Sequence, residues 1–415
     1  MNLSVLQKVV TLICVCTLLS VNAQETNAPK FGKGLFNLVG KDSTWSMKVG
    51  LRFQTLATSS WDASNGLSNP ASSMMIRRSR LKFDGFAYSP KLKYKVELGL
   101  SNRDQSGASK YTSNAPRYIL DAVLKWNFSG NFVLWAGQTK LPGNRERVIS
   151  SANLQQVDRS LLNSRFTIDR DMGIQLRHKF NLTDKFVVKE IFSIAQGEGR
   201  NVTRGNQGGH QFTTRVELFP FGKFASKGDY KGSDLKFEKK PKLSLGVAYD
   251  FNNNASKTRS NQGSYMYING TSEGSSAEFY QTNISTLYID AMYKHKGFSF
   301  MAEYANRDAD DPFAKNSDNT ALLDSDGKQV TVQVGNGLNL QTGYLLTKKI
   351  ELSARYTNIS YDRNITGKGA ENQYTLGLSK YIAGHSLKVQ TDLSYTDIGF
   401  KTNKLLFRLQ VDIHF

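Results

Sequence analysis

Cysteine and proline are scarce in this sequence of 415 residues. There are 2 cysteines and 8 prolines beside 34 glycines, 18 tyrosines and 24 phenylalanines. Few prolines and many aromatics disfavour proline-rich linkers and suit strands joined by tight turns. Beyond the N-terminal region, no apolar run approaches the roughly 20 residues that a membrane-spanning helix requires. A bundle of membrane helices is therefore excluded. A membrane barrel is not, because only alternate residues of its strands face lipid.

Residues 1–23 are typical of a secretory signal peptide. Lys8 precedes an apolar run from Val9 to Val21, and Val21 and Ala23 supply the small residues of a cleavage site. A lipoprotein signal is the rival, but neither cysteine follows the small residue that lipidation requires. Cleavage would remove both cysteines, so we expect an exported chain without disulfides or thiol chemistry.

The chain is strongly basic. It has 54 Lys and Arg against 35 Asp and Glu, a formal charge of +19 that falls to +18 when Lys8 leaves with the signal. Hydrophobic residues make up 39%, enough to exclude a disordered polyelectrolyte. The charge alone is compatible with nucleic acid, anionic lipid or small anions as partners.

Apolar residues recur with a period of two, which predicts strands with one apolar and one polar face. A clear example is the series Trp45, Met47, Val49, Leu51 and Phe53. About sixteen such strands are expected, near residues 43–58, 74–88, 91–103, 116–128, 130–140, 170–181, 184–197, 209–220, 241–253, 284–296, 297–308, 335–346, 349–361, 371–382, 385–398 and 403–415. Nucleic acid is then an unsuitable partner, because cations spread along strands offer no element that reads a groove.

The predicted connections alternate between short and long. Those after even-numbered strands are mostly tight turns, and those after odd-numbered strands are mostly long: 59–73, 104–115, 141–169, 254–283 and 309–334. Short turns on one rim and long loops on the other are typical of a transmembrane antiparallel β-barrel in the outer membrane of a Gram-negative bacterium. Two connections break the rule, the long 221–240 and the short 399–402. We expect residues 24–42 to be a short lead-in and residues 43–415 to form the barrel.

The last strand ends on an aromatic residue. Phe407, Leu409, Val411, Ile413 and Phe415 alternate with polar residues up to the C-terminus. This pattern resembles the signal by which the barrel-assembly machinery recognises outer-membrane barrels, so Phe415 is the predicted assembly signal.

No pattern predicts catalysis, a metal or a cofactor. The segment Gly270–Gly274 matches G-x-S-x-G but lies in a polar loop rather than a strand-to-helix elbow. The five histidines have no zinc-site spacing. The acidic segment 309–334 lacks the ligand ladder of a calcium loop.

Basic residues do form a pattern on one strand. In 74–88 the apolar phase is Leu81 and Phe83, which places Arg78, Arg80 and Lys82 in one row on the lumen face. Arg77 has the other phase and joins the row only if it lies above the lipid or the strand bulges there. A tube lined with one sign of charge concentrates the opposite ion.

These residues also carry a family resemblance. The segments 77–85 and 93–97, then Gly137–Pro142 and Arg170–Leu176, resemble the phosphate-selective porin O/P family. The resemblance implies a sixteen-stranded homotrimeric porin that passes anions, with an arginine ladder and a lysine-rich constriction. Arg77, Arg78 and Arg80 match the start of the ladder, and Lys140 matches the Lys of G-Q-x-K. Gly143 departs from the family, in which an aromatic commonly follows.

The resemblance gives the loop 141–169 a role. We expect it to fold into the lumen and narrow it, since loops of this length are usually functional or disordered. An exposed loop with ordinary ion pairs is the alternative. Guanidinium groups offer forked donors that match phosphate oxygens. The predicted anion-binding set is Arg77, Arg78, Arg80, Lys82, Lys93, Lys95, Lys140, Arg145, Arg147 and Arg159.

The sequence therefore predicts an outer-membrane porin for passive diffusion of phosphate, polyphosphate or other small anions. A surface adhesin or glycan-binding barrel, acting through Tyr265, Tyr267 and Trp61, is the alternative. A receptor of about 22 strands with a plug would not fit in the mature chain, and an outer-membrane enzyme is the least favoured class.

Overall fold

The computed structural model describes residues 29–64, 66–203, 207–274, 276–399 and 402–415. The predicted signal peptide lies outside the described residues. No helix among the described residues has the length and apolar character needed to cross a membrane.

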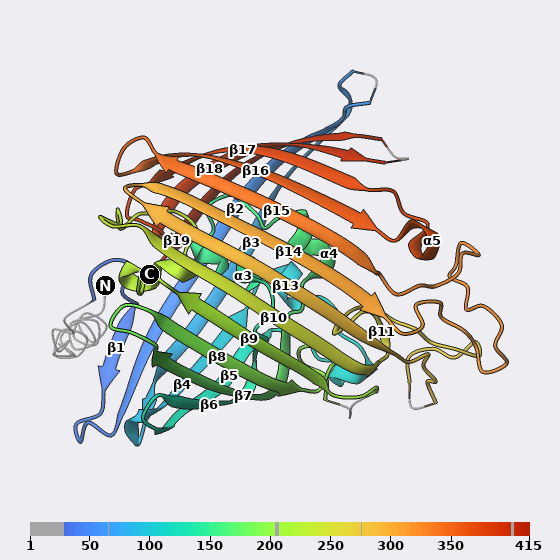
Figure 1. Ribbon diagram of the computed structural model, residues 1–415, viewed down its shortest axis with the longest axis horizontal. Coiled ribbons are helices and arrows are strands. Elements are labelled where there is room, and N and C mark those ends of the chain that lie inside the picture. Colours follow the sequence, from blue (N-terminus) through green and yellow to red (C-terminus); the bar gives the residue numbers. More distant parts are fainter. Residues whose placement is uncertain (1–28, 65, 204–206, 275, 400–401) are drawn as a thin grey trace, which may run out of the picture.

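Sixteen antiparallel strands form one closed barrel, as the sequence predicts (Figure 1). Each strand pairs with its neighbours in the chain, and β19 pairs with β2 to close the cylinder. The strands are β2 (Trp45–Asp62), β3 (Ser68–Ala87), β4 (Ser89–Gly99), β5 (Ile119–Ser129), β6 (Phe132–Lys140), β7 (Arg170–Asn181), β8 (Val187–Ala195), β9 (Gln211–Phe219), β10 (Lys242–Ala255), β13 (Thr282–His295), β14 (Phe298–Ala309), β15 (Gly335–Leu345), β16 (Ile350–Tyr361), β17 (Glu371–Tyr381), β18 (Leu387–Ile398) and β19 (Lys404–His414).

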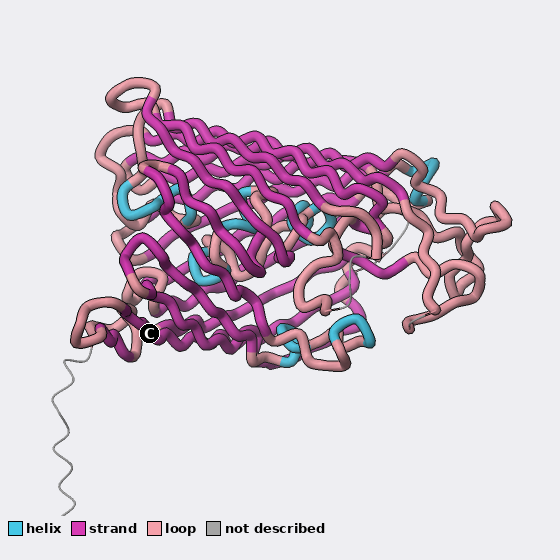
Figure 2. Tube along the Cα trace, turned by 90° about the horizontal axis from the view of Figure 1, so that it is seen from below, coloured by secondary structure: helices cyan, strands magenta, loops and turns pink. Residues whose placement is uncertain are grey.

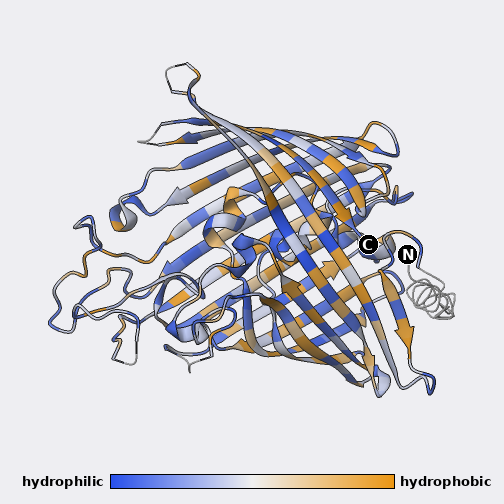
Figure 3. Ribbon diagram, turned by 180° about the vertical axis from the view of Figure 1, so that it is seen from behind, coloured by the Kyte–Doolittle hydropathy of each residue, from blue (hydrophilic) through white to orange (hydrophobic). Residues whose placement is uncertain are grey.

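The period-two pattern separates an outer from an inner face. On β19, Phe407, Leu409 and Val411 point outward and are 40–42% exposed. Gln410 and Asp412 point inward and are buried. Bands of apolar and polar residues alternate along the strands in Figure 3. The barrel thus presents an apolar surface outside and a polar one inside, the arrangement of a bilayer-spanning barrel.

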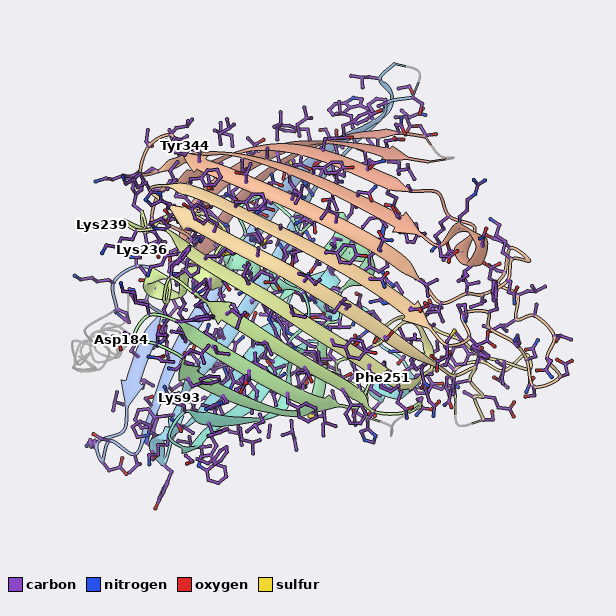
Figure 4. All side chains as sticks on the ribbon, in the orientation of Figure 1. Lys93, Asp184, Lys236, Lys239, Phe251 and Tyr344 are labelled. Atoms are coloured by element: carbon purple, nitrogen blue, oxygen red, sulfur yellow. The ribbon has the colours of Figure 1, made fainter. Side chains whose placement is uncertain are left out.

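The two rims differ as predicted. The short turns lie at the end that carries the termini, where Figure 4 labels Lys93, Asp184, Lys236 and Lys239. Phe415 lies at this rim, where its N–H donates to the carbonyl of Leu51 (2.9 Å). Its ring meets Phe31 edge to face.

One local prediction is wrong, and two segments predicted outside the barrel strands contain short strands of their own. Residues 59–73 are not a long loop, because β2 and β3 continue as a hairpin to Asp62 and Ser68. The lead-in 24–42 contains the short strand β1 (Phe36–Val39), which pairs with the start of β2. The predicted loop 254–283 contains the hairpin of β11 (Lys257–Arg259) and β12 (Gln262–Tyr265). Strands of three or four residues are too short to show the apolar alternation that reveals a barrel strand.

A β-bulge changes the phase of β3 at Arg77. Gln54 of β2 pairs with Arg78, but the next residue, Thr55, pairs with Ile76, so Arg77 is the extra residue. A bulge leaves one residue unpaired and re-aims the side chains around it. This places Arg77 on the inner side with Arg78, which is one of the two arrangements that the sequence left open.

Candidate functional site

The segment between β6 and β7 lies inside the barrel (Figure 2). It contains the helices α3 (Arg145–Val148) and α4 (Leu161–Phe166) and the 3₁₀ turn η2 (Ser151–Asn153). Gln155 donates to Ser299 Oγ (2.8 Å) and Glu351 Oε1 (2.7 Å) on the opposite wall. Arg165 pairs with Glu371 of β17 at 2.7 Å. We refer to residues 141–169 as the inner loop.

Apolar packing fixes the outer end of the inner loop. Leu162, Phe166 and Ile168 are fully buried against Tyr288 and other inward residues of the wall. The hydroxyl of Tyr288 donates to the carbonyl of Phe166 (2.6 Å). At the start of the loop, a Cβ on Gly143 would come within 2.6 Å of the Ile168 side chain. The glycine that departs from the family pattern therefore allows close packing here.

A buried ionic network anchors the other end. Arg145 lies 2.9 Å from Asp290 and 3.1 Å from Glu217, and Arg215 lies 2.7 Å and 3.0 Å from the same two carboxylates. All four side chains are at most 1% exposed. The two charges of each sign balance, so Arg145 has a structural environment with no access for a passing ion.

A second segment enters the barrel from the short-turn rim. It is the connection between β9 and β10, which contains the 3₁₀ turn η3 (Ala225–Tyr230). Lys294 of β13 donates to the carbonyls of Gly228, Lys231 and Ser233 at 2.8–2.9 Å. The N–H of Gly232 donates to the carbonyl of Asn153 in the inner loop (2.8 Å). The connection that broke the predicted alternation is thus an inward-folded segment that meets the inner loop.

A cavity of about 710 Å³ remains on the side of the barrel that these segments leave open. It extends from the inner loop to the short-turn rim along the inner faces of β3–β9 and is lined by 30 residues. Four of them are acidic: Glu97, Asp121, Glu190 and Asp229. Eleven are Lys or Arg: Arg80, Lys95, Lys125, Lys140, Arg170, Arg177, Lys179, Lys189, Arg215, Lys223 and Lys227. The cavity wall is therefore strongly cationic.

The predicted arginine row lies on the inner face and is paired with carboxylates. Arg77 and Arg78 approach Asp158 of the inner loop at 2.6 and 3.3 Å. Burial would raise the pKa of Asp158, but Arg78 and Arg77 together hold that pKa far below its usual range. The carboxylate therefore stays charged and ties the inner loop to β3.

Arg80 of this row forms a balanced ionic network with Lys95 of β4 and Arg170 of β7. The ion pairs are Arg80–Glu97 (3.0 Å), Arg80–Asp104 (3.4 Å), Lys95–Glu97 (2.7 Å), Lys95–Asp121 (2.7 Å) and Arg170–Asp121 (3.2 Å). Three cations thus face three carboxylates. Nearer the rim, Lys82 pairs with Asp84 (2.6 Å). Lys93 is exposed and forms no ion pair among the residues described.

Two predicted cations contact carbonyls instead of carboxylates. Lys140 donates to the carbonyls of Arg147 (2.7 Å) and Ile149 (3.1 Å). Arg159 donates to the carbonyls of Glu146 (3.0 Å) and Ile149 (2.8 Å). Within the described part of the chain, neither has a carboxylate within salt-bridge distance. Arg147 is paired with Asp169.

A tryptophan lies between two further cations of the cavity wall. The Lys125 ammonium is 3.9 Å from the ring centroid of Trp135, and the Arg177 guanidinium is 3.8 Å from the same centroid. Arg177 also donates to Gln175 Oε1 (2.7 Å). No carboxylate of the described chain pairs with Lys125 or Arg177. The apolar alternation of residues 116–128 and 170–181 puts Lys125 and Arg177 on the lumen face, but the alternation of residues 130–140 is too irregular to place Trp135 between them.

Two of the three aromatic residues of the alternative glycan-binding hypothesis, Tyr265 and Tyr267, pack in one cluster, whereas Trp61 lies on β2 opposite Leu405. Tyr265 and Tyr267 contact Phe279, and Tyr265 also contacts Tyr111, with ring centroids 4.9–5.9 Å apart. They join two long loops and form a small core there. The hydroxyl of Tyr111 is itself buried.

Comparisons with known proteins agree with the fold. A loop L8 deletion mutant of OmpT from Vibrio cholerae is 13% identical with a TM-score of 0.52, and the match covers 90% of this chain and 100% of that one. The outer membrane channel DcaP of Acinetobacter baumannii is 11% identical with a TM-score of 0.52, covering 91% and 99%. An anion-selective porin from Comamonas acidovorans is 12% identical with a TM-score of 0.51, covering 89% and 100%.

No curated protein sequence matches the chain. The family model described as phosphate-selective porin O and P matches residues 47–404, which is nearly the whole barrel. The chain therefore belongs to the phosphate-selective porin O and P family and is a porin of the Gram-negative outer membrane.

Proposed function

We propose that this porin passes anions, phosphate and polyphosphate among them, by passive diffusion through the cationic cavity. The observation that carries the proposal is the cavity wall, which has eleven Lys and Arg against four Asp and Glu. In a narrow tube with low-dielectric walls, such an excess raises the local concentration of anions and repels cations.

The cations without carboxylate partners are the proposed stepping sites. Lys140 has three N–H donors and the carbonyls use two, so one remains for an ion. Lys125 and Arg177 hold their charges against an aromatic ring, which attracts a cation without neutralising it. Several weak sites in series support conduction, whereas a single tight site would trap the ion.

The inner loop is the proposed constriction. It joins the ladder, through Asp158 with Arg77 and Arg78, to the carbonyl-bound cations Lys140 and Arg159. An anion that enters from the long-loop side would meet the paired guanidinium groups before the unpaired cations. Forked guanidinium donors favour oxyanions over chloride, because two oxygens can bind at once.

The proposal includes a homotrimer in outer-membrane lipid, assembled by the barrel-assembly machinery through Phe415. The outward side chains of β19 form an apolar row that ends beside Phe415. This row supports both the contact with lipid and the recognition of Phe415 during assembly. A chain that lacks Phe415 is expected to accumulate unassembled.

Ion selectivity in planar bilayers tests the function. In a KCl gradient, the reversal potential should have the sign of an anion-preferring pore, and replacing chloride by phosphate on one side should show whether phosphate permeates. Polyphosphate added on the long-loop side should reduce the chloride current. A closed barrel or a cation-preferring pore would overturn the proposal.

A further inference from the structure

The long-loop half of β3 has an edge that none of the described strands covers. β4 accompanies β3 only as far as Arg80, which pairs with Gly99, and the last backbone bond runs from Leu100 N to Ser79 O (2.8 Å). From Ser68 to Arg78, β3 pairs with β2 alone among the residues described. Alternate residues of such an edge direct their N–H and C=O groups to the open side. The hairpin stands clear of its neighbours in Figures 1 and 3.

This open edge lies at the depth of the apolar belt. Met74 pairs with Ala57 of β2, and Ala57 pairs with Leu409 in the middle of β19. Barrel strands are about 4.8 Å apart and tilted by about 40°, so each step to a neighbour shifts the level by roughly 3 Å. Two steps leave Met74 within about 6 Å of the level of Leu409, inside an apolar band about 25 Å tall. Hydrocarbon offers no hydrogen bonds to an open edge, so lipid is an unsuitable neighbour.

The outward side chains of this hairpin also differ from those of the rest of the belt. Ala57, Ser59 and Ser72 face outward beside the large apolar side chains of β19, and the two serine hydroxyls are 3.2 Å apart. Small side chains allow another backbone to approach closely. Met74 and Ile76 are 87% and 62% exposed and are available to pack against that neighbour.

We propose that the outer face and open edge of this hairpin, residues 55–62 and 68–76, form the contact with a second copy of this chain. The occupant must be embedded at the same depth, must offer hydrogen-bonding groups there, and must be present whenever the barrel is. A second copy meets all three conditions. Among the described residues, the short strands outside the barrel do not reach this edge, since β1 pairs with the other end of β2 and β11 pairs with β12.

The contact is heterologous, because identical edges cannot all pair with one another around a closed ring of three. This inference rests on the proposed trimer for the number of copies. It is independent of ion selectivity, because each barrel has its own cavity.

Photo-cross-linking from a single cysteine tests the contact. Both natural cysteines precede residue 24, so Met74→Cys would be the one thiol of a cleaved chain. Leu376→Cys on β17 is the matched control, because Leu376 is also outward and 64% exposed. Both variants are labelled with benzophenone maleimide and irradiated in outer membranes. Met74→Cys should yield a cross-linked adduct of two copies, and Leu376→Cys should yield much less of it.

Equal adduct yields from the two positions would overturn the proposal, as would adducts that contain only lipopolysaccharide or an unrelated protein. A second variant, Ser72→Arg, should run as single barrels rather than as an oligomer on gels of unheated samples. The mobility of these single barrels should still change on heating, which would show that they are folded. An intact oligomer in that variant would place the contact elsewhere. Single barrels that keep their anion preference would leave the proposed function standing.

Discussion

Two regions of the inner wall carry the same kind of charge and hold it differently. The buried cations of β3 and β4 are paired with carboxylates, as Arg80 is with Glu97 and Asp104. Two cations of β5 and β7, Lys125 and Arg177, have no carboxylate partner among the described residues and lie against the ring of Trp135. A balanced network contributes little field beyond its own dimensions, whereas unpaired cations contribute their full charge. The paired region therefore shapes the lumen and the unpaired region attracts the ion.

The largest expected effect comes from breaking the buried anchor that shapes the lumen. Arg145→Ala leaves buried Asp290 with Arg215 alone, and leaves Glu217 with Arg215 and the more distant Lys189. Removing one partner of a buried pair typically costs about 3–5 kcal/mol. We expect the inner loop to detach, with rapid proteolysis of residues 141–169 and a higher conductance. Unchanged proteolysis and conductance would show that the apolar contacts of Phe166 suffice to hold the loop.

The second prediction reverses the unpaired charge. The double variant Lys125→Glu with Arg177→Glu places two anions in the cavity and should lower the anion-to-cation permeability ratio about tenfold or more, the equivalent of about 1.4 kcal/mol. The double variant Lys95→Met with Glu97→Gln is the control, because it removes one cation and one carboxylate from the balanced network and leaves the net charge unchanged. Reversal potentials should shift in the first variant and hardly at all in the control. Equal shifts would contradict the division into two regions.

The third prediction converts the paired region into an unpaired one. Asp158→Asn frees Arg77 and Arg78 from their carboxylate and should raise the anion preference about two- to threefold. The measurement is the reversal potential in the same salt gradient. An unchanged preference would mean that the ladder lies outside the path of the ion.

Acid also distinguishes this variant. Pairing lowers the folded-state pKa of Asp158 below its unfolded value, so its stabilising contribution is present above the unfolded pKa and is lost as the pH falls through the folded pKa. The Asn variant should therefore lose less stability than the parent when the pH is lowered through the range of an ordinary carboxylate. Melting curves of the two proteins across that range provide the measurement.

The barrel could be predicted because the alternation that identifies each strand lies within that strand. Alternation along strands such as 45–53 and 403–415 follows from lipid on one side and water on the other. The family resemblance and the alternation of short and long connections predicted that these strands form a sixteen-stranded outer-membrane barrel. The extension of the β2–β3 hairpin was not predictable, because the small and polar residues Ala57, Ser59 and Ser72 carry no apolar alternation. Because Ser59 and Ser72 are small and polar, they were predicted to lie in a loop. The same property is the reason for proposing them as part of a subunit contact.

The site was less predictable, because partners in the lumen come from distant parts of the chain. Seven of the ten predicted cations could be placed by strand phase or motif, and Arg145, Arg147 and Arg159 by their loop. The carboxylates opposite them could not be placed. Arg145 meets Asp290 from β13 and Arg78 meets Asp158 from the inner loop. These ion pairs depend on how the inner loop and the connection between β9 and β10 fold into the barrel. The alternation of residues along the strands does not predict that folding. Arg145 is buried away from a passing ion, and whether the other nine cations bind anions stays a prediction for the bilayer measurements.

The smallest expected effect is the most specific to the unpaired region. Trp135→Leu keeps every charge of the cavity but removes the ring that holds Lys125 and Arg177, a contact worth about 0.5–2 kcal/mol for each cation. Because the long-range potential depends on charge alone, the permeability ratio should barely change. The two side chains become mobile, however, so single-channel current should become noisier and polyphosphate block weaker. A changed ratio with unchanged block would mean that the ring acts through the shape of the wall rather than by positioning its two cations.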